Sequence, residues 1–194
     1  MSTARLCKLP TAAGAGNLNS VRAFASNLCE DGWFARVGRP LDDSERALAT
    51  QYLSGLGLKA AALATVDTWS AAGATALRAD WERGWWQAEE SAQRALQAKA
   101  SREFGVPAVL AALTAVTEAA ASLHARAEQA CAGKGVADPA LTRVAAGAAA
   151  LACHQYGLVL AAGGGEDHPL ALKYRLFARG RWLLGVYGQQ CFVF

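Results

Sequence analysis

The stretch from residue 107 to residue 133, PAVLAALTAVTEAAASLHARAEQACAG, places apolar residues at the three- and four-residue spacing of one helix face. That face consists of Val109, Leu113, Val116, Ala120, Leu123, Ala127 and Cys131. Proline suits the first turn of a helix and glycine suits its end. Alanine, the strongest helix former, supplies about a quarter of the 194 residues. The stretch therefore predicts an all-α fold.

Similar patterns on both sides of this stretch predict further helices and one small hairpin. The expected helices span residues 20–31, 42–56, 58–77, 80–105, 138–163 and 167–180. Two short strands about a turn are expected within the last fifteen residues, so residues 181–194 are predicted to form a terminal β-hairpin. The whole is a bundle-like or orthogonal domain of six to seven helices covering residues 19–194, after a flexible lead-in at residues 1–18.

The net charge and the cysteine content bear on two questions: whether the protein binds nucleic acid, and which redox compartment it occupies. The formal net charge is +3, which is too small to indicate nucleic-acid binding, and the five cysteines include no closely spaced pair. Free thiols in a reducing cytoplasm of a bacterial-type cell are expected, with no metal and no cofactor. Residues 144–165 carry no charge and are long enough to span a membrane, but Ala, Gly and a central His154 favour a buried core helix.

The sequence contains no recognisable catalytic motif such as a phosphate-binding loop or a nucleophile elbow. Three polar residues in apolar surroundings remain as candidates for a site between helices: Asp67, His124 and His154. If buried, each needs a polar partner, and two of them facing one another in a pocket would favour a small-molecule binder or an enzyme.

Tryptophans close together in the sequence favour a different function. Trp81 and Trp85 share one helix face, whereas Trp86 is turned away from it by about a quarter-turn. Trp86 is therefore expected to be exposed, and the acidic Glu82, Glu89 and Glu90 are expected around it. Trp69 lies just upstream and is a further candidate. Core packing is one interpretation of these tryptophans. Because tryptophan is enriched at binding interfaces, the other is a ligand pocket or a surface for a protein partner or a second copy.

The C-terminal part of the sequence is basic. It contains no acid after Asp167 but four cations: Lys173, Arg175, Arg179 and Arg181. Cations near the end of a helix complement its dipole, which is favoured here over a phosphate or nucleic-acid site. The leading hypothesis is a helical protein-binding module with no evident catalytic motif, such as an adaptor, an inhibitor or immunity-like protein, or a regulatory subunit. The alternative is a small-molecule site around Asp67, His124 and His154.

Overall fold

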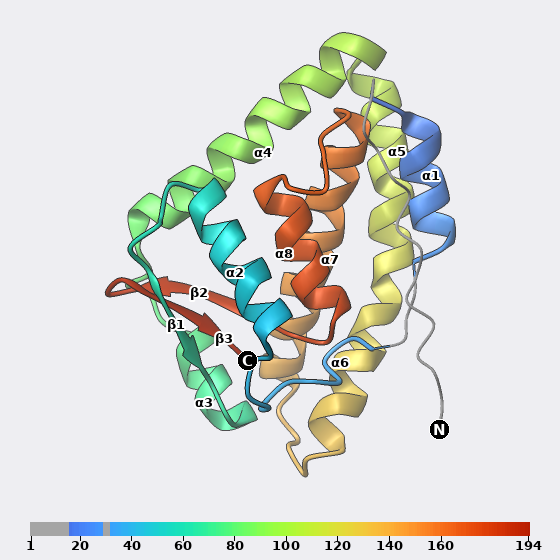
Figure 1. The fold of residues 1–194 in the computed structure, drawn as a ribbon. Coiled ribbons are helices and arrows are strands. Elements are labelled where there is room, and N and C mark those ends of the chain that lie inside the picture. Colours follow the sequence, from blue (N-terminus) through green and yellow to red (C-terminus); the bar gives the residue numbers. More distant parts are fainter. Residues whose placement is uncertain (1–15, 29–31) are drawn as a thin grey trace.

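The computed structural model describes residues 16–28 and 32–194, and the described residues form a helical domain with a small sheet at one side (Figure 1). The all-α prediction with a C-terminal hairpin is confirmed. The helices are α1 (Leu18–Ser26), α2 (Asp43–Gly55), α3 (Trp69–Ala76), α4 (Arg83–Phe104), α5 (Val106–Ala119), α6 (Leu123–Ala132), α7 (Pro139–Ala161) and α8 (Pro169–Ala178). The strands are β1 (Ala62–Thr65), β2 (Leu183–Tyr187) and β3 (Gln190–Val193).

Helix α7 occupies the centre of the core, where it packs against α1, α4, α5, α6 and α8 (Figure 1). The side chain of Asp138 accepts hydrogen bonds from the first free amides of the helix, as the sequence predicts. Small residues such as Ala145, Ala149 and Ala152 are fully buried along it and allow neighbouring helices to approach closely. At Gly157 even one added methyl group would meet the side chain of Leu113.

The stretch that suggested the fold forms two helices rather than one. Helices α5 and α6 are joined by a 3₁₀ turn at Ala120–Ser122, and the predicted apolar face continues through the bend into the core. The hydroxyls of Thr117 and Ser122 donate to the carbonyls of Leu113 and Ala119. Such back-bonding is a known cause of helix bending.

In the described part of the chain, two helical stretches are long and apolar enough to cross a membrane, judged by length and composition alone. They are Val106–Ala132 and Pro139–Ala161. In the most apolar 18-residue part of each stretch, 33% of the residues of the first and 67% of those of the second are buried inside the protein. The prediction that residues 144–165 form a core helix agrees with the burial of α7.

The sheet places β3 between its two neighbours. Strand β3 pairs antiparallel with β2 and parallel with β1. Gly188 and Gln189 connect the hairpin with φ angles of 53° and 61°, and two positive values in succession match the turn type that tight hairpins favour. The predicted terminal hairpin is therefore present, although it is two-thirds of a larger sheet.

The prediction of a helix over residues 58–77 is wrong. Residues 62–65 form β1, so strand is not confined to the last fifteen residues, and α3 begins only at Trp69. The alanines of this segment favour a helix, but the β-branched Thr65 and Val66 that follow them favour extended backbone. The helix start is marked by Thr68, whose hydroxyl accepts from the amide of Ala71 at 3.1 Å.

Other expectations lie partly outside the described residues. The lead-in predicted for residues 1–18 falls mostly there, and α1 begins at Leu18 with Asn17 as its cap. The first helix ends at Ser26, earlier than the predicted Asp31, and residues 29–31 of that prediction lie outside the described residues.

Three of the five cysteines lie among the described residues. Cys131, Cys153 and Cys191 are free thiols and buried, whereas Cys7 and Cys29 lie outside the described residues. Burial raises the pKa of both Cys153 and Cys191 to about 12. Because the thiolate is the reactive form, these two side chains behave as inert core residues.

Candidate functional site

Trp85 and Trp86, at the start of α4, take the orientations that the sequence predicts, whereas Trp81 lies before the helix, which begins at Arg83 rather than at residue 80. Trp85 is buried, Trp81 is half-buried, and Trp86 keeps 48% of its surface exposed. The ring of Trp86 lies 4.9 Å from that of Trp85, and the ring of Trp81 lies 5.9 Å from Trp85. The exposed ring therefore rests on a buried one.

The hairpin extends this aromatic region. Phe192 of β3 lies edge-on to Trp81 at 6.5 Å, and the amide of Glu82 donates to the carbonyl of Val186 at 2.8 Å. Trp81 covers the backbone of Gly185, where a Cβ atom would meet its ring at 2.7 Å. We call Trp81, Trp86, Tyr187 and Phe192 the aromatic surface.

Tyr187 is held in place on this surface by a cation. The guanidinium of Arg78 lies 3.7 Å from the centre of the Tyr187 ring. Arg78 in turn forms a two-bond ion pair with Asp80, at 2.9 Å for each bond. Tyr187 is therefore exposed to solvent, but its contact with Arg78 restricts the position of its ring.

A buried polar network supports Trp85 from below. Its indole nitrogen donates to the hydroxyl of Tyr52 at 2.6 Å, and this hydroxyl donates to the carboxylate of Glu89 at 2.5 Å. Lys173 donates to both carboxylate oxygens at 2.8 Å. Burial raises the pKa of Tyr52 well above its ordinary value, and the Glu89 carboxylate raises it further, so the hydroxyl remains a donor. The network ties α2, α4 and α8 together.

The position of Glu89 corrects one prediction. Glu89 was expected beside the exposed Trp86, but it is 3% exposed and points into the core toward Lys173. Residues three apart on a helix share a face only approximately, and the buried side of α4 begins between them. Glu82 and Glu90, one turn before and one turn after Trp86, are both exposed. Glu90 forms an ion pair with Arg94.

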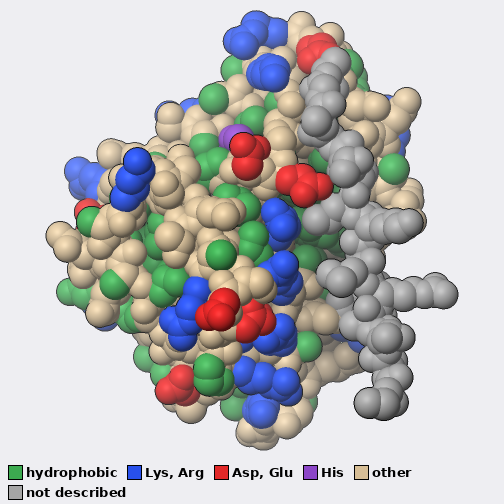
Figure 2. All heavy atoms as spheres, viewed as in Figure 1, with side chains coloured by type: hydrophobic (Ala, Val, Ile, Leu, Met, Phe, Trp, Pro, Cys, Tyr) green, Lys and Arg blue, Asp and Glu red, His purple; other side chains and the backbone are tan. Residues whose placement is uncertain are grey.

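A second buried ion pair accounts for part of the basic C-terminal segment. Arg181 is fully buried; it donates to the carboxylate of Glu45 at 2.7 Å and to the backbone carbonyls of Arg36, Arg39 and Pro40. Figure 2 shows basic side chains gathered around acidic ones over the first turn of α2, where Arg36 also pairs with Asp42 at 2.9 Å. Lys173 and Arg181 are thus internal partners of acids rather than a surface for nucleic acid.

The polar candidates from the sequence do not form a common site. Asp67 is exposed in the loop between β1 and α3, His124 is exposed on α6, and His154 is half-buried in α7. No described hydrogen bond or ion pair joins any two of them, and neither of the two cavities described below is lined by one. Among residues 16–28 and 32–194, no group of three or more His, Cys, Asp or Glu side chains is placed to hold a metal ion.

Trp69 lies in the core rather than on a surface. It is buried against Phe194, edge-on at 5.0 Å, and against Trp182 at 6.1 Å. Within residues 16–28 and 32–194, its indole nitrogen has no hydrogen-bond partner. Trp69 therefore anchors α3 to the hairpin, and of the two candidate tryptophans only Trp86 is accessible.

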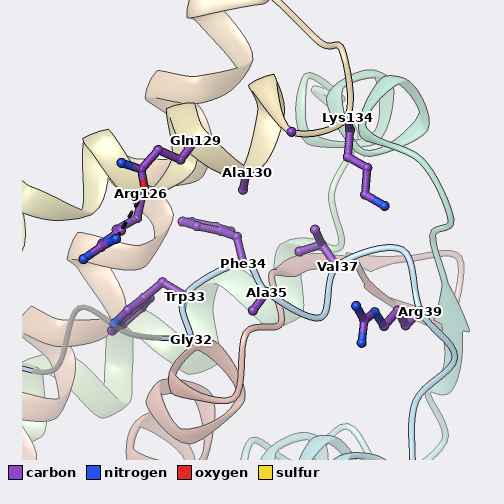
Figure 3. Close-up of a pocket in the computed structure, with 11 residues that line it drawn as sticks. Gly32, Trp33, Phe34, Ala35, Val37, Arg39, Arg126, Gln129, Ala130 and Lys134 are labelled. Carbon is purple, nitrogen blue, oxygen red and sulfur yellow. Dashed lines mark hydrogen bonds between the residues drawn. The ribbon is translucent and has the colours of Figure 1, made fainter. Parts of the chain in front are cut away.

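The described residues also line two cavities, and the sequence alone does not indicate either of them. An apolar groove of about 250 Å³ lies between α3 and the start of α7, with Leu77 and Leu141 among its lining residues. A larger cavity of about 350 Å³ lies between α6 and the loop that precedes α2 (Figure 3). Each is built from segments distant in the sequence, so no local pattern announces it.

The cap of α8 predicts a measurable pH dependence. The His168 Nδ1 atom accepts from the amide of Leu170 at 3.2 Å, which requires an unprotonated ring nitrogen. Burial lowers the pKa of His168 in the folded protein, against a smaller opposite effect of Asp167. The neutral ring therefore stabilises the fold above the unfolded-state pKa, about 6.5, and this contribution is lost as the pH falls below that value.

The substitution His168→Asn keeps a capping acceptor but removes the titrating group. We expect the free energy of unfolding to fall less between pH 7.5 and pH 5 in this variant than in the wild type. Chemical denaturation at the two pH values measures the difference. Because His154 also has a pKa lowered by burial, the comparison is between variant and wild type. An identical loss in both proteins would contradict the assignment.

No family model, characterised protein or solved structure matches this chain.

Proposed function

We propose that the protein is a helical protein-binding module and that it binds its partner through the aromatic surface, with the exposed Trp86 as the main contact. The observation that carries the proposal is the 48% exposure of Trp86 directly above a buried, fully hydrogen-bonded support. Tryptophan is among the residues most enriched at the energetic centres of interfaces, because its large ring loses little conformational freedom on binding.

The support beneath Trp86 lowers the cost of binding. Trp85 is fixed by Tyr52, Glu89 and Lys173, and the ring of Trp86 lies against Trp85 at 4.9 Å. A side chain that is already ordered loses less entropy when a partner covers it. The arrangement thus favours a preformed contact surface.

The charges around Trp86 indicate the chemistry of the partner. Glu82 and Glu90 flank the ring along α4, and Glu82 has no ion pair among the described residues. A partner that offers an apolar recess for the indole, with lysine or arginine at its edge, matches this surface in shape and charge. We propose such a protein as the occupant.

The small-molecule alternative at Asp67, His124 and His154 receives no support. The three residues lie on different elements, and neither cavity is lined by any of them. No observation favours catalysis at these positions.

Site-specific photocrosslinking tests the proposal. A benzophenone amino acid is placed at position 86, and, as a matched control, at position 110, because Leu110 is 52% exposed on α5, away from the start of α4 (Figure 1). In an extract of the source organism, position 86 should give a discrete crosslinked product that position 110 does not give.

Competition makes the result specific. Excess unlabelled wild-type protein should abolish the product, whereas excess Trp86→Ala protein should leave it. A product with the mass of two copies of the chain would identify the partner as a second copy. Equal crosslinking at both positions, or no product at position 86, would contradict the proposal.

A further inference from the structure

The larger cavity is lined by one loop and one helix. Its walls come from the segment 32–39 and from α6 with the residues that follow it (Figure 3). The volume of about 350 Å³ lies at the lower end of the range for small-molecule sites, about 300–1,000 Å³, and suits a ligand of roughly one ring. The lining residues are Gly32, Trp33, Phe34, Ala35, Val37, Arg39, Arg126, Gln129, Ala130, Gly133 and Lys134.

The charged side chains of this lining are all cationic. Arg39, Arg126 and Lys134 line the cavity, and no carboxylate does among the residues described; Glu30 and Asp31 precede Gly32 and are not described. Arg39 and Lys134 form no ion pair within residues 16–28 and 32–194.

The nearby Arg36 behaves differently. Three residues before Arg39, it pairs with Asp42 at 2.9 Å and with Glu45 at 3.2 Å. The charge of Arg36 is therefore neutralised by Asp42 and Glu45, whereas Arg39, from the same loop, lines the cavity. The described charged groups of the lining, all cationic, favour an anion as the ligand.

Ring contacts and a backbone hydrogen bond hold the loop at residues 32–39 in place beside the cavity. Phe34 has a φ of +59°, a left-handed conformation that is strained for a bulky residue, yet its ring is buried. The ring packs against Trp69 at 6.1 Å and against Trp182 at 6.5 Å. The amide of Arg36 donates to the carbonyl of Gly180 at 3.1 Å. These contacts hold the strained backbone in place on this side of the cavity.

The polar groups divide between two sides of the cavity. In Figure 3, Lys134 and Arg39 lie on one side, Arg126 and Gln129 lie on the other, and Phe34 and Val37 lie between them. Arg126 donates to the side-chain oxygen of Gln129 at 3.2 Å, which orients both groups. A ligand that matches this layout has an anionic group at one end and an apolar body.

We propose that this cavity binds a small organic anion, with a phosphate or carboxylate group between Arg39 and Lys134 and a ring-sized apolar body over Phe34 and Val37. Arginine and lysine both bind these groups through charge-assisted hydrogen bonds. The site is separate from the aromatic surface, so the two proposals can succeed or fail independently.

Calorimetric titration of the full chain with four probes tests the proposal. Phenyl phosphate and benzoate carry both the ring and the charge, inorganic phosphate carries only the charge, and benzyl alcohol carries only the ring. We expect a dissociation constant of about 1 mM or lower for at least one of the two ring-bearing anions. Inorganic phosphate and benzyl alcohol should each bind at least about tenfold more weakly.

Matched variants locate the binding. Arg39→Gln and Lys134→Gln should each weaken binding about tenfold, as expected for the loss of a hydrogen bond to a charged group. Lys99→Gln removes an exposed charge on α4, outside the cavity lining, and should leave the affinity unchanged. Unfolding curves of all three should match the wild type, because the replaced side chains are exposed.

Three results would overturn the proposal. The first is no binding of either ring-bearing anion at 10 times the expected constant, about 10 mM. The second is an equal loss of affinity in Lys99→Gln, which would show non-specific attraction. The third is inorganic phosphate binding as tightly as phenyl phosphate, which would remove the role of Phe34 and Val37.

Discussion

Removal of residues 191–194 is expected to unfold the protein. These residues form most of β3, which is the middle strand of the sheet, so the deletion takes away the partner of both β1 and β2. Trp182 and Phe194 also exchange two backbone hydrogen bonds, at 2.7 and 2.8 Å.

The side chains lost in this deletion are core residues. Cys191, Val193 and Phe194 are all 1% exposed or less. Burial of a large apolar side chain contributes about 1.5–3 kcal/mol, and a domain has only about 5–15 kcal/mol in total. We therefore expect the truncated protein to lack a cooperative thermal transition.

Two milder variants keep this prediction testable if the truncated protein cannot be purified. Phe194→Ala should lower the free energy of unfolding by about 3–5 kcal/mol, because the ring fills the space beside Trp69 and Trp182. Phe194→Leu should lose less, since it keeps most of the apolar volume. An unchanged melting curve for the truncated protein would show that β3 does not hold the sheet.

The substitution Lys173→Met should destabilise the protein by about 3–5 kcal/mol. Lys173 is 5% exposed and is the only cation that an ion pair places on Glu89 within residues 16–28 and 32–194. Methionine keeps the length of the side chain but leaves the Glu89 carboxylate buried without its counter-charge. Chemical denaturation at pH 7 measures the loss.

A second substitution separates charge from packing. Glu89→Gln on the Lys173→Met background removes the remaining charge and keeps an oxygen for the Tyr52 hydroxyl. The double variant should recover most of the lost stability, because replacing both members of a buried pair costs far less than breaking it. A double variant as unstable as Lys173→Met alone would mean that the network acts through packing and not through charge.

The sequence predicts those parts of the fold that local signals determine. Asp42 with Glu45, and Asp138 with Pro139, start helices where their capping patterns predict them. Trp85 and Trp86 separate into buried and exposed because their 100° offset on a helix depends on no distant contact.

The sequence fails where distant segments decide the structure. Residues 62–65 look helical because alanine is a good helix former, but pairing with β3 makes them a strand. Glu89 and Glu90 cannot be distinguished by residue type. Only the position of Lys173, 84 residues further along the chain, makes the first an internal partner.

The sequence does not indicate the larger cavity, for the same reason. Phe34 adopts its left-handed backbone because rings from two other segments surround it, and no turn residue marks that conformation. Asp67, His124 and His154 are polar residues in apolar stretches of sequence, yet Asp67 and His124 are exposed to solvent in the structure.

The affinity of the Trp86→Ala protein for the partner captured at position 86 tests the central claim most directly. Calorimetric titration of that purified partner should show a loss of about 2 kcal/mol or more, about thirtyfold, while Leu110→Ala binds like the wild type. The Trp86→Ala protein should unfold within about 0.5 kcal/mol of the wild type, whereas Trp85→Ala should lose about 3–5 kcal/mol. Unchanged affinity for Trp86→Ala, or a stability loss as large as that of Trp85→Ala, would contradict a binding role for the exposed ring.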